Sequence, residues 1–329
     1  MGWYSAVGRP AFFTLPPEAA HRVANALLGL PLGWRRMGGV PDDPALVTSI
    51  AGIELRNPVG LAAGFDKTCA HLDQLGRLGF GYVVGGTITR APRRGNPKPR
   101  IVRYRVRGAM ANAMGLPNPG AEAAARHLAA HPRTAPRIVS IADEATADAL
   151  EAFERLAPLV DAVELNASCP NVSWGRDRDN EAHLADLLDG FRARSETPVF
   201  VKLPPFVTDV EREVVLALAR IAQERGAAAL TCANTRPHEE PRLSVNRGGL
   251  SGRDLRAATP GIVAAVHETT GGALPVNACG GVATPDDVRS CLDAGATTVQ
   301  IYTSLVYEGP GIVGRLCRGL VAGRIPTGA

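Results

Sequence analysis

RIVSIADEATADALEAFERLAPLVDAVELN, residues 137–166, is the stretch that decides the fold. Apolar runs at 137–142 and 160–166 have the length of buried strands. Between them, residues 145–157 carry apolar side chains at helical spacing. Strands that are apolar on both faces and are each followed by a helix are typical of a parallel sheet. The stretch therefore predicts two parallel strands joined by a helix.

The same alternation recurs along most of the chain. Buried strands are expected at 58–63, 81–87, 137–142, 160–166, 198–203, 228–233, 274–278 and 298–303. Amphipathic helices are expected at 69–78, 120–130, 145–157, 181–193, 209–225 and 284–294, among others. Eight such units over roughly 250 residues match a parallel (β/α)8 TIM barrel. A doubly wound sheet is the alternative, but no GxGxxG motif follows the first strand.

Two segments depart from this alternation. Residues 88–118 are rich in Pro, Gly and Arg, and we expect a structured insertion there. Residues 1–40 include Pro16-Pro17-Glu18, which favours a helix start because proline is tolerated in the first turn and glutamate complements the helix dipole. We expect one or two short helices in this segment. The chain is therefore divided into an N-terminal helical extension at 1–40 and a barrel at 41–329.

The composition excludes several classes of protein. Of the 329 residues, 45% are hydrophobic and 21% charged, which is normal for a soluble globular protein. A net charge of +4 is too weak to indicate a nucleic-acid partner. The six cysteines form no CxxC pair and have no histidines at zinc spacing, so we expect free thiols, no metal site and a reducing, cytoplasmic setting. We find no signal peptide and no run near the ~20 apolar residues that span a bilayer.

Polar side chains gather where the predicted strands end, which is where such a barrel carries its chemistry. The first strand ends in GLAAGFDK at 60–67, where small residues let a flat ligand approach and Lys67 adds a cation, a solvated turn lysine being the alternative. The fifth strand ends at Lys202. Four asparagines lie at strand ends or in the adjoining insertion: Asn112, Asn166, Asn171 and Asn234. Because asparagine is a poor strand residue and buried amides need partners, the cluster indicates a planar, amide-rich ligand.

Small-residue turns follow the last two strands. Gly280-Gly281 follows the seventh strand, and Tyr302-Thr303-Ser304 follows the eighth. Barrels often bind phosphate between these two loops. Residues 248–252, GGLSG, offer further close backbone contacts. We therefore expect the phosphate end of the ligand here.

Cys169 lies in the polar loop Asn166-Ala167-Ser168-Cys169-Pro170-Asn171. A free thiol has a pKa of ~8.5, and nearby donors would raise its thiolate fraction near neutrality. A general base at this point fits a reaction that removes a proton from carbon. A nucleophile or an inert loop cysteine are the alternatives, although no histidine is placed to activate a nucleophile.

Together these residues resemble the dihydroorotate dehydrogenase family over nearly the whole chain. The motifs that carry the resemblance are GLAAGFDK (60–67), GNPKPR (95–100), LNASCPN (165–171), VKL (201–203), ANT (233–235), GGLSG (248–252) and QIYTS (300–304). The resemblance implies an FMN flavoprotein that oxidises dihydroorotate to orotate in pyrimidine biosynthesis, with Cys169 as the base. It implies that the pyrimidine is held by Lys67, Asn112, Asn166, Asn171, Asn234 and Thr235. It implies that FMN is lined by Ala63, Gly64, Lys67, Thr87, Asn166, Lys202, Gly252, Gly281, Tyr302 and Thr303.

Two features of the resemblance indicate different electron acceptors. Residues 17–22, PEAAHR, look like the N-terminal extension of the membrane-associated, quinone-reducing class, in which His21 and Arg100 or Arg103 would lie near the quinone. The SCPN sequence at 168–171 looks like the soluble class, which uses fumarate or a partner flavoprotein linked to NAD, whereas the quinone class usually carries serine as the base. We expect a quinone as the acceptor and peripheral contact of residues 1–40 with the inner face of the cell membrane.

Three alternatives stay open on the sequence alone. The acceptor could be soluble, the substrate could be another dihydropyrimidine or related ring, or the barrel could only bind a nucleotide or pyrimidine without catalysis. The oligomeric state is also open, with a homodimer as one arrangement.

Overall fold

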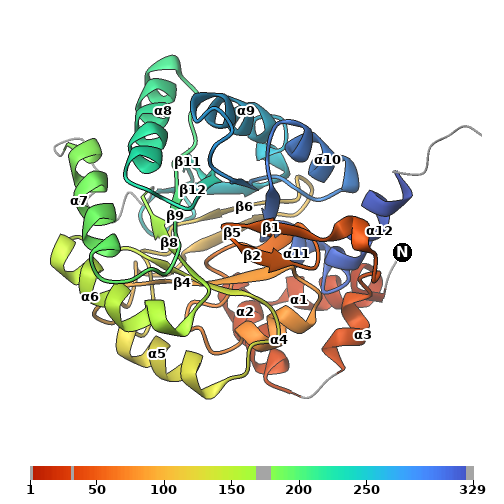
Figure 1. Ribbon diagram of the computed structural model, residues 1–329. Coiled ribbons are helices and arrows are strands. Elements are labelled where there is room, and N and C mark those ends of the chain that lie inside the picture. Colours follow the sequence, from red (N-terminus) through yellow and green to blue (C-terminus); the bar gives the residue numbers. More distant parts are fainter. Residues whose placement is uncertain (1–2, 31–32, 168–178, 324–329) are drawn as a thin grey trace, which may run out of the picture.

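Eight parallel strands form a closed barrel at the centre of the computed structural model, which describes residues 3–30, 33–167 and 179–323 (Figure 1). Their order around the barrel is β10-β13-β14-β3-β4-β7-β8-β9. The strands are β3 (Val59–Leu61), β4 (Tyr82–Ile88), β7 (Arg137–Ile141), β8 (Ala162–Asn166), β9 (Val199–Lys202), β10 (Ala229–Cys232), β13 (Val276–Cys279) and β14 (Thr298–Ile301). Each overlaps the range expected for it, so the predicted (β/α)8 barrel is confirmed.

Helices surround the barrel and bury their apolar faces against it (Figure 1). They are α4 (Leu72–Arg77), α5 (Ala121–Ala130), α6 (Thr146–Leu156), α7 (Asn180–Arg192), α8 (Asp209–Glu224), α9 (Thr259–Thr269), α10 (Pro285–Asp293), α11 (Thr303–Glu308) and α12 (Ile312–Ala322). Local sequence sets their starts: at α8, the Thr208 hydroxyl accepts from the Glu211 N–H while the Glu211 carboxylate accepts from the Thr208 N–H. Neighbouring helices also pack together, as where Phe153 of α6 stacks on Phe191 of α7.

A short antiparallel hairpin closes the N-terminal end of the barrel. It consists of β1 (Thr48–Ile50) and β2 (Ile53–Leu55) and lies across the barrel in Figure 1. Ile50 and Leu55 are buried against residues at the starts of the barrel strands, among them Tyr82 and Phe200. The chemistry is therefore confined to the opposite end.

A four-stranded antiparallel sheet lies at that opposite, C-terminal end. Its strands, in the order β11-β12-β6-β5, are β5 (Ile101–Tyr104), β6 (Ala109–Asn112), β11 (Arg236–Glu239) and β12 (Arg247–Gly252). The insertion at 88–118 is thus structured, as predicted, but half of the sheet comes from the segment after β10, where no strands were expected. Gly249 is required at one point of this sheet because a Cβ there would collide with the Thr235 side chain.

The N-terminal segment contains more helix than the one or two short helices expected from the sequence. After a π-helical turn at Tyr4–Gly8 come α1 (Arg9–Thr14), α2 (Pro17–Leu28) and α3 (Trp34–Gly38). The extra turns are stabilised by distant contacts: the Tyr4 hydroxyl donates to the Val306 carbonyl at 2.8 Å, and the Phe13 and Tyr307 rings pack edge to face. None of the described helices has the length and apolar character needed to cross a membrane.

Candidate active site

A cavity of about 1250 Å³ lies between the C-terminal ends of the barrel strands and the antiparallel sheet. Every described residue that was predicted to bind ligand lines this cavity. These are Ala63, Gly64, Lys67, Thr87, Asn112, Asn166, Lys202, Asn234, Thr235, Gly252, Gly281, Tyr302 and Thr303. Residues from five barrel strands, the sheet and the loops between them thus converge on one space. Cys169 and Asn171 lie outside the described residues.

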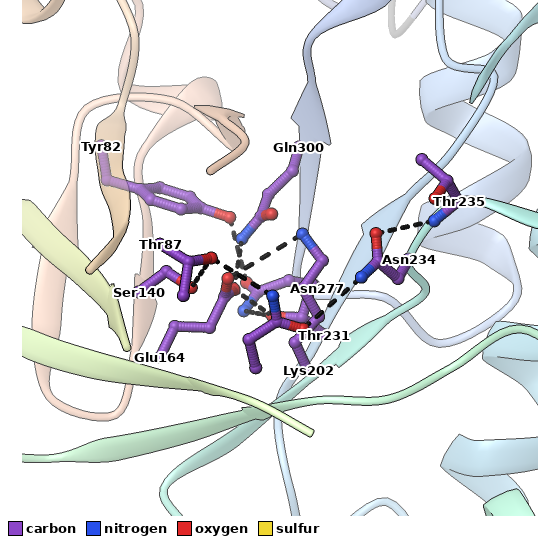
Figure 2. A network of polar contacts seen from close by, with 11 residues as sticks. Tyr82, Thr87, Ser140, Glu164, Lys202, Thr231, Asn234, Thr235, Asn277 and Gln300 are labelled. Atoms are coloured by element: carbon purple, nitrogen blue, oxygen red, sulfur yellow. Dashed lines mark hydrogen bonds and ion pairs between the residues drawn. The ribbon is translucent and has the colours of Figure 1, made fainter. Parts of the chain in front are cut away.

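A chain of hydrogen bonds fixes the amides on one side of the cavity (Figure 2). The Asn166 amide nitrogen donates to the Thr87 hydroxyl at 3.2 Å, and the Asn234 amide nitrogen donates to the Asn166 oxygen at 3.4 Å. The Asn234 oxygen in turn accepts from the Thr235 backbone N–H at 2.8 Å. Thr87 shares a further hydrogen bond of 3.0 Å with Ser140. Because each amide is held by a neighbour, its donor and acceptor faces are set before a ligand arrives.

Lys67 follows β3, lines the same cavity and is partly buried. Its ammonium group donates to the Gly64 carbonyl. Burial lowers the pKa of Lys67 to about 8, although the Asp66 carboxylate opposes that shift. Lys67 therefore changes charge close to neutral pH.

The floor of the cavity is a buried ion pair, of which the sequence analysis identified only one member. The Nζ of Lys202 lies 3.8 Å from Oε1 of Glu164, which is 0% exposed. The Glu164 Oε2 atom accepts from the Thr231 hydroxyl at 2.9 Å and from the Gln300 amide at 3.4 Å. Glu164 precedes Asn166 by two residues on β8, so strand alternation puts both on the same face, inside the barrel. This spacing of two residues from Asn166 could have identified Glu164 in the sequence.

Below this pair, further polar side chains fill the barrel (Figure 2). Asn277 donates to the Thr231 hydroxyl at 3.2 Å and accepts from the Tyr82 hydroxyl at 3.1 Å. Tyr82 also shares a hydrogen bond of 2.8 Å with Thr298. Interiors of such barrels are usually filled by branched apolar residues, so this interior is more polar than is usual for the fold.

The N-terminal helices contact the mouth of the cavity through charged and aromatic residues. Glu18 of α2 receives two hydrogen bonds, of 3.2 and 2.7 Å, from the guanidinium group of Arg100, the residue before β5. The His21 ring packs against Phe65 with a centroid distance of 5.2 Å, and Phe65 packs against the cavity-lining Tyr302 at 5.6 Å. Burial lowers the pKa of His21 to about 4, so its imidazole is neutral at pH 7.

Arg103 has a different environment from the other residues expected near a quinone. It donates to the backbone carbonyls of Phe12 and Leu15, and its guanidinium carbon lies 4.4 Å from the centroid of the Phe13 ring. These contacts join the α1–α2 corner to the antiparallel sheet. Arg103 thus anchors the extension, whereas His21 and Arg100 lie nearer the cavity.

Comparison with known proteins agrees with this geometry. The model of the family described as dihydroorotate dehydrogenase matches residues 45–323, which include every described barrel strand. The chain belongs to the dihydroorotate dehydrogenase family. It is therefore an oxidoreductase of a flavin-dependent family, which confirms the resemblance found in the sequence.

Relatives in the dihydroorotate dehydrogenase family also match the N-terminal segment. A protein from Novosphingobium aromaticivorans named dihydroorotate dehydrogenase (quinone) is 39% identical over 329 residues, covering 95% of this chain and 93% of that protein. A protein of the same name from Erythrobacter litoralis is 39% identical over 326 residues, with coverage of 95% and 93%. The ligand-free crystal structure of the Eimeria tenella enzyme superposes with a TM-score of 0.79 at 30% identity, covering 93% of this chain and 94% of that one.

Proposed function

We propose that this chain oxidises dihydroorotate to orotate with a bound FMN and passes the electrons to a quinone. Family membership supports the reaction, and the similarity to relatives named dihydroorotate dehydrogenase (quinone) supports the acceptor. The observation that carries the proposal is the convergence of fixed amides and two lysines, Lys202 buried and Lys67 partly buried, on one cavity. Such a cavity suits a planar heterocycle stacked on a second planar ring.

The residues of the cavity fit FMN. The volume of about 1250 Å³ exceeds the roughly 300–1,000 Å³ of most small-molecule sites, which leaves room for two ligands. Ser304, next to Thr303 after β14, has a buried hydroxyl without a hydrogen-bond partner among the described residues, as a missing polar ligand would leave it. FMN would be held by Ala63, Gly64, Lys67, Thr87, Asn166, Lys202, Gly252, Gly281, Tyr302 and Thr303. When bound, the flavin supplies the hydride acceptor.

The amide-rich side of the cavity suits the pyrimidine. Amides and hydroxyls offer both donors and acceptors to a ring that carries N–H and C=O groups alternately. In its protonated form, the Lys67 ammonium complements the carboxylate of dihydroorotate. We assign the pyrimidine to Lys67, Asn112, Asn166, Asn171, Asn234 and Thr235. Cys169 would take the proton from the ring carbon, because a thiol can form the thiolate that a base requires.

The N-terminal helices would admit the quinone and touch the membrane. Their surface exposes several apolar side chains, among them Trp3 at 60%, Val7 at 68% and Leu30 at 48%. Apolar residues on short helices with flanking arginines are typical of segments that lie in the membrane interface. The protein would then be cytoplasmic and peripheral on the inner face of the membrane. A homodimer stays a prediction.

One spectroscopic experiment tests both half-reactions. Anaerobic addition of dihydroorotate to the FMN-loaded protein should bleach the flavin absorbance, and a soluble quinone should then restore it. Bleaching by another dihydropyrimidine but not by dihydroorotate would show that dihydroorotate is not the substrate. Recovery of the flavin absorbance with fumarate but not with the quinone would show that the acceptor is soluble and not a quinone. A protein that stays colourless after addition of FMN would be only a binding barrel.

A further inference from the structure

The cavity floor contains a formal negative charge that ligand binding does not require. Glu164 is fully buried inside the barrel, and its partner Lys202 is 5% exposed. Among the described residues, Glu164 is the only acidic side chain within ion-pair distance of Lys202. At 3.8 Å the pair is an ion pair without a hydrogen bond, and Lys202 itself lines the cavity.

Stability alone does not account for this carboxylate. Burying a charge costs several kcal/mol, and well-packed apolar residues of similar volume are often as stable as a buried ion pair. Glu164 is also incompletely satisfied, because only its Oε2 atom accepts hydrogen bonds while Oε1 has none among the described residues. A carboxylate kept under these conditions, directly behind a cavity-lining cation, indicates an electrostatic role.

The groups around the pair are uncharged near neutrality. Burial raises the pKa of the Cys279 thiol and of the Tyr82 hydroxyl, so both keep their protons. Thr231 and Gln300 carry no charge. Burial disfavours the charged form of Lys202, yet its pKa is raised. Because the Cys279 thiol keeps its proton, the Glu164 carboxylate is the charged group that opposes burial. Glu164 therefore holds the charge state of Lys202.

We propose that Glu164 is a positioning residue that keeps Lys202 protonated and offsets its charge beneath the ligand, and thereby sets the reduction potential of the bound flavin. The inference rests on the proposed function, since it requires FMN in this cavity. Two electrons and a proton leave the flavin more negative, so an uncompensated cation beside it favours the reduced form. Removing the Glu164 charge should raise the potential as long as Lys202 stays protonated.

The same removal should make the potential depend on pH in a new way. Without Glu164, burial is the dominant influence on Lys202 and its pKa falls. Lys202 would then lose its charge as the pH rises, and the potential would return toward the value of the unmodified protein.

The test is the midpoint potential of the FMN-loaded protein between pH 6 and pH 9 in three forms. Glu164→Gln should shift the potential to a more positive value at pH 6 and add a pH-dependent step. Thr231→Val removes a hydrogen bond from the same carboxylate but keeps its charge, so it should follow the unmodified curve. Glu164→Gln combined with Gln300→Glu returns one carboxylate to a neighbouring position and should reverse most of the shift.

Several outcomes would overturn the proposal. A flavin-loaded Glu164→Gln protein with the unmodified potential at every pH would make Glu164 a structural group only. If that variant does not retain flavin, Gln300→Glu takes its place, since an added carboxylate should move the potential to a more negative value and an unchanged value refutes the idea. An unmodified protein that binds no flavin refutes the proposed function itself, which separates the two failures.

Discussion

Lys67 and Lys202 line the same cavity, but their surroundings shift their pKa values in opposite directions. Lys67 has no close carboxylate partner within ion-pair distance among the described residues, and burial lowers its pKa to about 8. Lys202 has Glu164 beside it, and its pKa lies above the usual value. Lys67 can therefore gain or lose a proton near neutrality, while Lys202 stays charged.

Orotate binding should weaken as Lys67 loses its proton. Well below pH 8 the ammonium group attracts the ligand carboxylate, so affinity should be nearly constant there. Between pH 8 and pH 9 the protonated fraction falls from about one half to about one tenth, so affinity should fall about fivefold. Orotate titrations of the FMN-loaded protein, followed by the flavin spectrum, measure this directly. Lys67→Met should bind weakly at every pH and remove the step. An affinity that is the same at pH 7 and pH 9 would contradict the assignment of Lys67 to the pyrimidine.

Cys169→Ala should slow reduction of the flavin by ~10²-fold or more, because the ring proton then has no base. Stopped-flow mixing with dihydroorotate under anaerobic conditions isolates this half-reaction. Cys169→Ser is the matched variant: its hydroxyl is a weaker acid than the thiol, so its rate should recover as the pH rises. Equal reduction rates for the alanine variant and the unmodified protein would remove Cys169 from the mechanism.

The barrel strands could be predicted from the sequence because each carries its own local signal. A run such as Val199–Lys202 is apolar on both faces and is followed by a helix, whatever its neighbours are. The antiparallel sheet lacks such signals. Its β6 strand pairs with β12, whose register joins Asn112 to Gly249, and no local pattern specifies a partner that far along the chain. In addition, β11 is half exposed and contains Pro237, which argues against a strand.

Some residues of the candidate site could likewise be predicted from local sequence, and others could not. Lys67 and Asn234 stand out because polar residues interrupt small or apolar stretches at strand ends, and the structure brings them to one cavity. Glu164 lies inside an otherwise apolar strand, and its importance depends on Lys202, Thr231 and Gln300 from three other strands. Its role could be recognised only once the barrel was closed.

Helix α2 should loosen when its ion pair with the sheet is removed. Glu18→Gln leaves the largely buried Arg100 guanidinium without its carboxylate, which costs roughly 1.5–3 kcal/mol for a charged hydrogen bond. Hydrogen exchange should quicken in Pro17–Leu28 and stay unchanged in the barrel strands. Glu122→Gln is the control, because its bidentate pair with Arg155 is exposed and contributes little. Equal exchange in α2 for both variants would contradict this anchoring.

At the scale of the whole molecule, the predicted division between the barrel and a helical extension at residues 1–40 stays a prediction. Every barrel strand pairs with a neighbour on both sides, so barrel closure does not depend on residues 1–40. The segment contributes Leu28 to the main core and packs Trp34 against it. The extension is therefore expected to add function and some stability, whereas the fold belongs to the barrel.

Removal of residues 1–40 should separate the two half-reactions. The shortened protein should still bleach on addition of dihydroorotate, because the cavity lining lies entirely within the barrel and its sheet. Reoxidation by a soluble quinone should fall at least tenfold, since the contacts of His21 and Glu18 at the mouth are lost. The melting temperature should drop as well. Unchanged quinone turnover after truncation would show that the helices take no part in reoxidation by the quinone.

The hairpin that closes the N-terminal end of the barrel also offers a site for attaching the protein to a label or a support. Its tip, Ala51-Gly52, is a turn with left-handed backbone angles, and the space around Gly52 is open. This tip belongs to the hairpin packed against the starts of the strands, at the end opposite the cavity. A linker or dye attached there would point away from every reacting group. Tethered by this turn to an electrode or a bead, the enzyme would present its working face outward in a uniform orientation.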